Sequence, residues 1–288
     1  MLTVYAPAKV NLVLEVLGKC GDYHRIASIL QTIDLYDVLS FEPAEDLSFG
    51  CSEPGLESDN LAMEAARLVK EATKCGKGAR IELRKHIPWG TGLGGGSSDA
   101  AAALLALNQL WKLQLSTSDL LRLASELGSD VPFFIYGGTA LIEGQGERVT
   151  PLPLLNPTTF VLVVPPLGAT RDKTRQLYGK LNADCFTEGH YVRTALSSLR
   201  QDGTVLPSMM FNAFERVAFD FFAGLSEVRR AFREAGAPSV HLAGSGPCLL
   251  APVPGKDLAE AMRSRLENQG MRCYTASSSA PAWKTGQT

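Results

Sequence analysis

The spacing of hydrophobic and polar positions changes several times along the chain and predicts a mixture of strands and helices. Segments in which apolar residues alternate or run together are typical of strands; they occupy residues 2–6, 11–16, 29–41, 79–87, 133–136, 139–143, 158–164, 239–242, 249–253 and 272–276. Segments with apolar residues at helical spacing occupy residues 61–72, 97–111, 116–127, 173–181, 192–199, 210–218, 225–235 and 257–268. We therefore expect both sheet and helix throughout the chain.

Three short segments separate these elements. Pro7-Ala8-Lys9 lies between the first two strand patterns and is predicted to be a turn. Residues 151–157 contain three prolines in seven positions, which indicates a linker between two domains. Residues 277–288 carry no clear pattern, and we expect them to form a loose tail.

A glycine-serine run, PWGTGLGGGSSDA over residues 88–100, lies between a strand pattern and the most strongly helical stretch of the chain. Five of the seven residues 90–96 are glycines, which lets a bulky anion approach the backbone and permits positive φ values. The helix that follows, with Ser97 or Ser98 as its predicted N-cap, directs unpaired N–H groups and the positive end of its dipole toward the same loop. This arrangement indicates an anion site, and phosphate is the usual ligand of such a site.

Several kinds of loop are compatible with a glycine run. Gly90, Gly92 and Gly95 satisfy the G-x-G-x-x-G pattern of dinucleotide-binding folds, but those folds need a strand after the helix. Here a second helical pattern, 116–127, follows instead. A Walker P-loop needs a lysine after the last glycine, where this chain has Ser97. The remaining interpretations are a nucleotide loop in which serine hydroxyls meet the phosphates and a metal ion, and a turn that binds nothing. Five glycines are costly in chain entropy for a turn alone.

Composition narrows the classes of function. The chain has 288 residues, of which 45% are hydrophobic and 20% charged, and a formal net charge of −2, so it can form a large core and two domains. It has no long basic run, and we expect no nucleic-acid partner. Since no apolar stretch is long enough to cross a bilayer and no export signal is evident, we expect a cytoplasmic protein without a membrane partner. The six cysteines lack metal-ligand spacing and are expected to be reduced thiols.

Three blocks of sequence resemble the motifs of one superfamily. They are APAKVNL over residues 6–12, PWGTGLGGGSSDAA over 88–101 and LAGSGPC over 242–248. These blocks are similar to the N-terminal motif, the phosphate loop and the third motif of the galactokinase, homoserine kinase, mevalonate kinase and phosphomevalonate kinase superfamily, the GHMP kinases. The resemblance implies an α+β, two-domain GHMP kinase fold. Residues 1–155 would form a ribosomal protein S5 domain 2-like domain with the ATP and catalytic sites, and residues 156–288 a ferredoxin-like, βαβ-type domain.

Further segments resemble one branch of that superfamily. They are YH at 23–24, QTIDLYD at 31–37, GSDVPFF at 128–134, GGTA at 137–140 and EGQGE at 143–147. The branch phosphorylates the tertiary 2-hydroxyl of a small molecule, cytidyl diphosphate methylerythritol, in non-mevalonate isoprenoid biosynthesis, with ATP and Mg²⁺. The chain departs from the branch at Gly21-Asp22, where the reverse order is usual, and at Asn212, which is not followed by an acidic residue. We therefore assign Asn212 no substrate role.

The resemblance implies two catalytic residues. Asp130 is the candidate base, although an aspartate in a short loop often only satisfies nearby N–H groups. Lys9 is the candidate cationic partner, since a lysine beside a carboxylate keeps it ionised and can neutralise developing negative charge. Its flanking residues are apolar, which favours a partly buried lysine over one in a solvated turn.

The resemblance also implies the residues that bind the two substrates. The ATP phosphates are assigned to Pro88, Gly90, Gly92, Leu93, Gly94, Gly95, Gly96, Ser97 and Ser98, with Ser98 also the candidate Mg²⁺ ligand and Asn60 a candidate contact of the nucleotide base. The phosphoryl acceptor is assigned to Asn11, Tyr23, His24 and Tyr178. Tyrosine can stack on a pyrimidine and imidazole can hydrogen-bond its edge. Helix capping by the serines and Asn60, and core packing of Tyr178, are the plainer alternatives.

Two other functions stay open on the sequence. One is a different small-molecule kinase of the superfamily, of the homoserine or mevalonate type, although neither substrate offers a pyrimidine for Tyr23 and His24. The other is a nucleotide-binding regulatory protein without turnover, against which the presence of both Lys9 and Asp130 argues. Both a monomer and a homodimer are compatible with the sequence.

Overall fold

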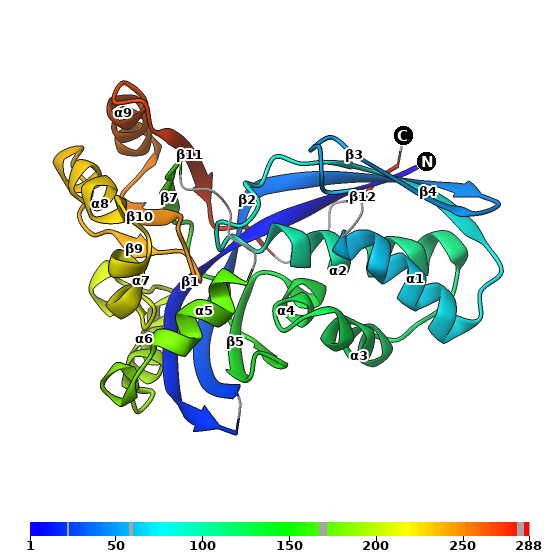
Figure 1. Ribbon diagram of the computed structural model, residues 1–288, viewed down its shortest axis with the longest axis horizontal. Coiled ribbons are helices and arrows are strands. Elements are labelled where there is room, and N and C mark those ends of the chain that lie inside the picture. Colours follow the sequence, from blue (N-terminus) through cyan, green and yellow to red (C-terminus); the bar gives the residue numbers. More distant parts are fainter. Residues whose placement is uncertain (22, 58–59, 167–171, 281–284, 288) are drawn as a thin grey trace.

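Figure 1 shows a computed structural model of the chain, which describes residues 1–21, 23–57, 60–166, 172–280 and 285–287. Its described part contains a larger, mainly antiparallel sheet with helices beneath it and a smaller sheet with further helices beside it (Figure 1). Both helix and strand are present in each half, as the sequence pattern predicts.

The larger sheet is built around two long antiparallel strands, β1 (Leu2–Cys20) and β2 (Tyr23–Ala44). Its other strands are β3 (Leu47–Cys51), β4 (Gly78–Arg84), β5 (Thr139–Gly144), β6 (Arg148–Pro151), β8 (Phe211–Asn212) and β12 (Thr285–Gln287). Strand β4 pairs antiparallel with β2, and β3 runs parallel to β4. Strand β5 pairs with the first half of β2, so the sheet divides around the bend of that strand.

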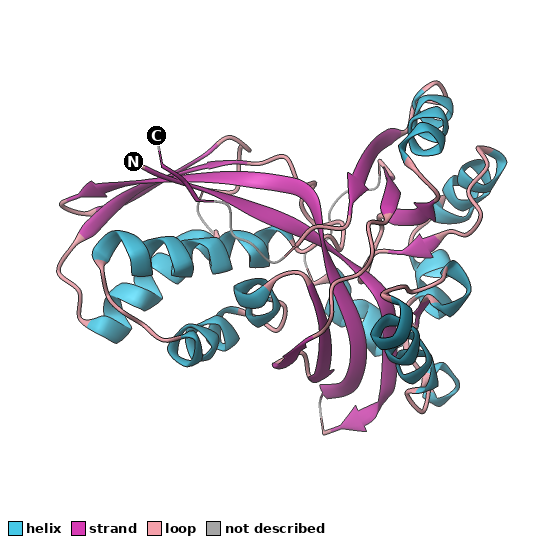
Figure 2. Ribbon diagram, turned by 180° about the vertical axis from the view of Figure 1, so that it is seen from behind, coloured by secondary structure: helices cyan, strands magenta, loops and turns pink. Residues whose placement is uncertain are grey.

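One face of this sheet is covered by helices, as Figures 1 and 2 show. They are α1 (Leu61–Thr73), α2 (Gly95–Trp111), α3 (Thr117–Leu127) and α4 (Val131–Tyr136). Helix α2 is buried on nearly every side, because residues 100–103 are four consecutive alanines with no exposed surface. The core between helices and sheet includes Phe41, Ile81, Leu104 and Phe133.

The smaller sheet has the strand order β11-β7-β10-β9 and is antiparallel. Its strands are β7 (Thr159–Val164), β9 (His241–Leu242), β10 (Leu249–Val253) and β11 (Arg272–Ser277). The helices of this half are α5 (Lys173–Lys180), α6 (His190–Asp202), α7 (Glu215–Phe221), α8 (Leu225–Glu234) and α9 (Lys256–Glu267), with short 3₁₀ turns at Ala183–Cys185 and Pro207–Met209.

Strand β1 belongs to both halves. Residues 8–16 are buried throughout, and one hydrophobic cluster joins Val10 and Leu12 of this strand to Phe160 of β7 and Leu250 of β10. The buried Glu15 carboxylate accepts the N–H of Val192 in α6 at 2.7 Å. Strands β8 and β12 also pair with β1. The domain boundary predicted between residues 155 and 156 stays a prediction. Strands β8 and β12, which follow that boundary in the sequence, belong to the larger sheet.

Four predicted segments differ from the structure. Pro7-Ala8-Lys9 is not a turn, because β1 continues through it with an irregularity between Pro7 and Ala8. Residues 133–136 lie in helix α4, whose first turn accommodates Pro132. A short apolar run cannot be assigned to strand or helix by periodicity. The helix predicted over 210–218 is strand β8 followed by α7. The tail is not wholly loose, since β12 pairs with the start of β1.

The two glycine turns of the motifs lie against each other and connect the two sheets. Gly92 has φ +91°, and a Cβ atom there would collide with the carbonyl oxygen of Ala243. The N–H of Cys248 donates to the oxygen of Thr91 at 3.2 Å. A side chain at Gly244 would lie 2.8 Å from the oxygen of Gly92. The main chains of the two turns are therefore in direct contact.

This contact makes Gly92 a stability determinant. We expect Gly92→Ala to lower the free energy of unfolding by about 2 kcal/mol or more, because positive φ strains an L-residue and the methyl group separates the turns. Urea unfolding measures the change. Gly96→Ala is the control: its Cβ would lie 3.6 Å from Leu61 Cδ1, an ordinary contact in the first turn of α2. Equal losses in the two variants would show that the turns do not need to touch.

Candidate active site

Lys9 lies at the centre of the predicted site. Its N–H donates to the oxygen of Leu93 at 2.9 Å, which ties β1 to the glycine loop. The residue is only 4% exposed, yet its ammonium group is paired: Nζ donates to Asn11 Oδ1 at 2.8 Å and lies 3.6 Å from Asp130 Oδ2. The structure thus brings together the two residues predicted to be catalytic.

Asp130 immediately precedes helix α4 and is the more open member of the pair. Its side chain is 40% exposed, whereas the next residues of α4, Val131 to Phe134, are buried in the core. The N–H of Val131 donates to the oxygen of Gly128 at 3.2 Å, which forms a tight turn before the helix. The carboxylate therefore lies on a rigid support and remains accessible to a substrate.

Asn11 is held from both ends of its amide. Its oxygen accepts the Lys9 ammonium, and its Nδ2 donates to Ser28 Oγ at 2.9 Å. The Ser28 hydroxyl in turn donates to the oxygen of Val13 at 2.6 Å. This chain of hydrogen bonds orients Lys9 toward Asp130, so Asn11 acts on the site at least through Lys9.

The glycine loop approaches Lys9 closely because it lacks side chains. Gly94, with φ +75°, is the N-cap of α2, so the prediction that Ser97 or Ser98 caps the helix is wrong. A Cβ atom on Gly94 would lie 2.9 Å from both Lys9 Cγ and Phe134 Cζ. The first hydrogen bond of the helix runs from the N–H of Ser98 to the oxygen of Gly94, which leaves the preceding N–H groups without a helical partner.

Ser98 has an unpaired side chain beside the glycine loop. Its hydroxyl oxygen is buried and has no hydrogen-bond partner among the residues that the structure describes. Buried hydroxyls are almost always paired, so an unpaired one beside a glycine cradle fits a residue that meets a phosphate or a metal ion. Within the loop predicted to bind ATP, Leu93 and Gly94 lie directly against Lys9.

The third motif completes the surroundings of Lys9. A Cβ atom on Gly244 would lie 3.0 Å from Lys9 Nζ. The buried Asn212 holds this turn: its Nδ2 donates to the oxygens of Leu242 and Gly244, both at 2.8 Å, and its oxygen accepts the N–H of Phe214 at 3.0 Å. Asn212 thus has a structural role, and the prediction that it does not bind the substrate stays a prediction.

A buried ion cluster that the sequence analysis did not identify lies beneath the loop. Lys85 is paired with Asp37 and, at 2.7 Å, with Asp99, and the three side chains are at most 5% exposed. Burial and the Asp37 carboxylate raise the pKa of Asp99 above its usual range. Burial alone would lower the pKa of Lys85, but the Asp99 and Asp37 carboxylates have the larger effect, and the pKa of Lys85 is raised. Asp99 therefore belongs to this cluster. The only feature of the sequence that could have indicated the cluster is Asp99, the acidic residue directly after Ser97 and Ser98.

The residues predicted to bind a pyrimidine lie at the other end of the site. Tyr23 is 62% exposed, and its neighbour Asp22 lies outside the described residues. His24 stacks on Tyr178, with ring centres 4.8 Å apart and planes inclined by 21°. Burial and then the Lys19 cation lower the pKa of His24, which favours a neutral imidazole. The buried Nε2 of His24 has no hydrogen-bond partner among the described residues, and its role in binding the pyrimidine stays a prediction.

Tyr178 links this aromatic group to the catalytic pair. It lies on α5 and packs edge-on against Phe214, with ring centres 4.8 Å apart. Burial, and then the nearby Asp130 carboxylate, raise the pKa of its hydroxyl. Tyr178 thus packs in the core and also lies against His24, the other aromatic residue assigned to the pyrimidine.

Asn60 has a clear local role. It is the N-cap of α1: its oxygen accepts the N–H of Ala62 at 2.9 Å, and its Nδ2 donates to the oxygen of Leu56 at 3.1 Å. Both ends of the amide are therefore occupied, and its contact with a nucleotide stays a prediction.

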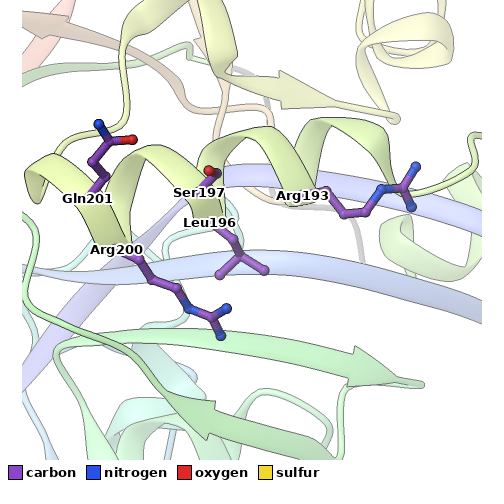
Figure 3. Close-up of a pocket in the computed structure, with 5 residues that line it drawn as sticks. All are labelled: Arg193, Leu196, Ser197, Arg200 and Gln201. Carbon is purple, nitrogen blue, oxygen red and sulfur yellow. The ribbon is translucent and has the colours of Figure 1, made fainter.

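Other features of the described residues add little to the site. Figure 3 shows a hollow on α6 lined by Arg193, Leu196, Ser197, Arg200 and Gln201, and it contains none of the predicted site residues. Within the described ranges, no group of three or more His, Cys, Asp or Glu side chains is placed to hold a metal ion. In the same part of the chain, no helix has both the length and the apolar character needed to cross a membrane.

Comparison with known proteins agrees with this arrangement. The GHMP kinases N terminal domain matches residues 60–138, and the GHMP kinases C terminal domain matches residues 192–272. The 4-diphosphocytidyl-2-C-methyl-D-erythritol kinase of Dehalococcoides mccartyi is 44% identical over 98% of this chain and 99% of its own length. The enzyme of that name from Symbiobacterium thermophilum is 38% identical over 90% of this chain and 93% of its own.

Solved structures extend the comparison to the fold. A crystal structure of 4-(cytidine 5'-diphospho)-2C-methyl-D-erythritol kinase has a TM-score of 0.81 and 36% identity, and the match covers 96% of this chain and 98% of that one. A homoserine kinase from Cytophaga hutchinsonii shares the fold with a TM-score of 0.75 at 22% identity, covering 97% and 94% of the two chains.

The fold and its three converging motifs thus define a GHMP kinase, with the α+β, two-domain organisation that the sequence predicts. Within that superfamily, the chain belongs to the 4-diphosphocytidyl-2-C-methyl-D-erythritol kinase family.

The geometry of Asn60 allows its two roles to be separated. If it is only a helix cap, Asn60→Ala should lower the free energy of unfolding by about 1 kcal/mol and leave the KM for ATP unchanged. Asn60→Asp is the matched control, because it retains a capping oxygen. A several-fold rise in the KM for ATP in Asn60→Ala, with stability unchanged, would instead assign the residue to the nucleotide.

Proposed function

We propose that this chain transfers the γ-phosphoryl group of ATP to the tertiary 2-hydroxyl of 4-diphosphocytidyl-2-C-methyl-D-erythritol, a step of the non-mevalonate isoprenoid pathway. The observation that carries the proposal is the buried Lys9 ammonium, which lies 3.6 Å from Asp130 at the point where the glycine loop and the third motif meet. Phosphoryl transfer requires mainly positioning and charge neutralisation, and this arrangement supplies both.

Asp130 is proposed as the general base. A tertiary hydroxyl is crowded and weakly acidic, so a carboxylate that stays ionised and accessible is needed to accept its proton. Lys9 lies beside Asp130 and neutralises negative charge that develops on the reacting oxygens. Asn11 maintains the orientation of Lys9 through the 2.8 Å hydrogen bond.

ATP and Mg²⁺ are the proposed cofactors. The N–H groups at the start of α2 and the bare glycines of the loop suit a polyphosphate, and the unpaired Ser98 hydroxyl suits Mg²⁺ or a phosphate oxygen. The ion, when bound, neutralises negative charge on the phosphates. The chain's own contribution is to hold the triphosphate so that its terminal group faces Lys9 and Asp130.

Recognition of the cytidyl group is assigned to the aromatic end of the site. The exposed ring of Tyr23 is available to stack on a pyrimidine, and the unpaired Nε2 of a neutral His24 is available to hydrogen-bond its edge. These features favour a cytidyl substrate over homoserine or mevalonate, which have no aromatic ring.

The catalytic assignment is tested by ADP release. The purified protein with Mg-ATP should release ADP with the cytidyl diphosphate alcohol and not with homoserine or mevalonate. We expect Asp130→Asn and Lys9→Ala each to lower kcat by about 100-fold or more, because each removes a group that acts in the transition state.

Asp220→Asn, which changes an exposed carboxylate on α7, should retain wild-type turnover. Near-normal kcat in either site variant would remove that residue from the mechanism, and turnover of homoserine or mevalonate alone would reassign the substrate.

The substrate assignment is tested at the aromatic end. Tyr23→Ala should raise the KM for the cytidyl substrate about tenfold, as expected for loss of one stacking contact worth about 1–1.5 kcal/mol, and leave the KM for ATP within about twofold. Tyr5→Ala, which removes another exposed tyrosine of the same sheet, is the control. Equal rises in both KM values for Tyr23→Ala would contradict stacking on the cytosine.

A further inference from the structure

A second buried lysine lies at the third motif. Lys173 is the first residue of α5 and is 8% exposed, and its ammonium group donates to the carbonyl oxygen of Gly246. The adjacent Thr174 hydroxyl lies 2.7 Å from Ser245 Oγ, so the start of α5 is held against the same glycine turn. This turn also approaches Lys9, which means that two buried ammonium groups flank one short stretch of main chain.

The charge of Lys173 has no counterpart within the described residues. No carboxylate there pairs with it, and the charged groups that influence it are the Lys9 ammonium and the Cys248 thiol. Burial, and then the Lys9 cation, lower the pKa of Lys173 to about 8. Burial raises the pKa of Cys248 to about 12, so this thiol is neutral near neutral pH. A carbonyl oxygen is a partial partner for a buried ammonium, and two such cations without an anion between them are unfavourable.

A bound anion would remove this imbalance. We propose that Lys173 is a further phosphate-binding residue of the active site, an inference that rests on the proposed kinase function. Two phosphates of the reaction suit it: the γ-phosphoryl group of ATP, which must reach Lys9, and the diphosphate of the acceptor. Helix α5 carries Lys173 at one end and, five residues later, Tyr178, which is predicted to bind the pyrimidine; the diphosphate of the acceptor connects that base to the reacting alcohol.

Steady-state kinetics of Lys173→Met test the proposal. We expect kcat/KM to fall at least about tenfold. A rise in the KM for ATP identifies the γ-phosphoryl group as the ligand, and a rise in the KM for the cytidyl substrate identifies its diphosphate. A fall in kcat with both KM values unchanged would overturn the proposal. Lys180→Met, an exposed lysine of the same helix, should behave as wild type. Values of kcat and both KM within about twofold of wild type in Lys173→Met would overturn the proposal.

The pH profile separates phosphate binding from simple support of the turn. The ammonium form of Lys173 is the one that binds phosphate, so wild-type kcat/KM should decline as the pH rises above about 8. Arginine stays charged throughout this range, so Lys173→Arg should shift the decline to higher pH. A decline that does not move in an active Lys173→Arg variant would overturn the proposal, whereas lost hydrogen bonding to Gly246 changes the thermal midpoint without moving the decline.

Binding measurements keep this inference separate from the proposed function. Calorimetry with cytidine 5'-diphosphate and with a non-hydrolysable ATP analogue should show at least about tenfold weaker binding of one of them in folded Lys173→Met. If the wild-type protein binds these probes but does not turn over the cytidyl substrate, the proposed function fails and Lys173 is still tested. If the wild-type protein turns over and binding by Lys173→Met is unchanged, the inference alone fails.

Discussion

The close approach of two glycine turns is the constraint on which this site depends. One turn leads into α2 and the other connects two strands of the smaller sheet, and Gly92 and Gly244 allow their main chains to touch. The contact joins elements more than 140 residues apart in sequence. The main chains of both turns lie close to Lys9. A side chain at either glycine would separate the turns and let water reach Lys9. Its charge would then interact more weakly with neighbouring groups, because water screens it.

Three buried lysines lie near the two turns, and each has different partners for its positive charge. Lys85 is neutralised within the protein by Asp37 and Asp99, so its cluster supports the loop from below. Lys9 is matched by a hydrogen-bonded amide and one half-open carboxylate. Lys173 has a carbonyl oxygen and no described carboxylate. The three lysines thus differ in how far the described residues neutralise them: Lys85 by two carboxylates, Lys9 by one carboxylate and an amide, and Lys173 by a carbonyl oxygen.

Much of this arrangement could be read from local pattern. The glycine loop, the Ala- and Leu-rich helix after it and the capping of α1 by Asn60 follow from residue types at adjacent positions, and the structure confirms them. Helix α4 was mistaken for a strand, because six apolar residues in a row are compatible with either element when buried on all sides. The Pro7–Lys9 segment was mistaken for a turn, because proline indicates a break unless a neighbouring strand absorbs it through an irregular register.

Residue types at adjacent positions predicted an anion-binding loop, since such a loop depends on backbone freedom and on short-range spacing. The candidate base Asp130 and its cationic partner Lys9 came from the resemblance to the family and stay predictions. Four features could be seen only in the folded chain. They are the burial of Lys9, the stacking of His24 on Tyr178, the ion cluster around Lys85 and the contact of Lys173 with the third motif. Each joins residues from separate elements. The distances between these residues and their burial depend on strand register and on how β1 packs between both sheets. The spacing of residues along the sequence determines neither the register nor the packing.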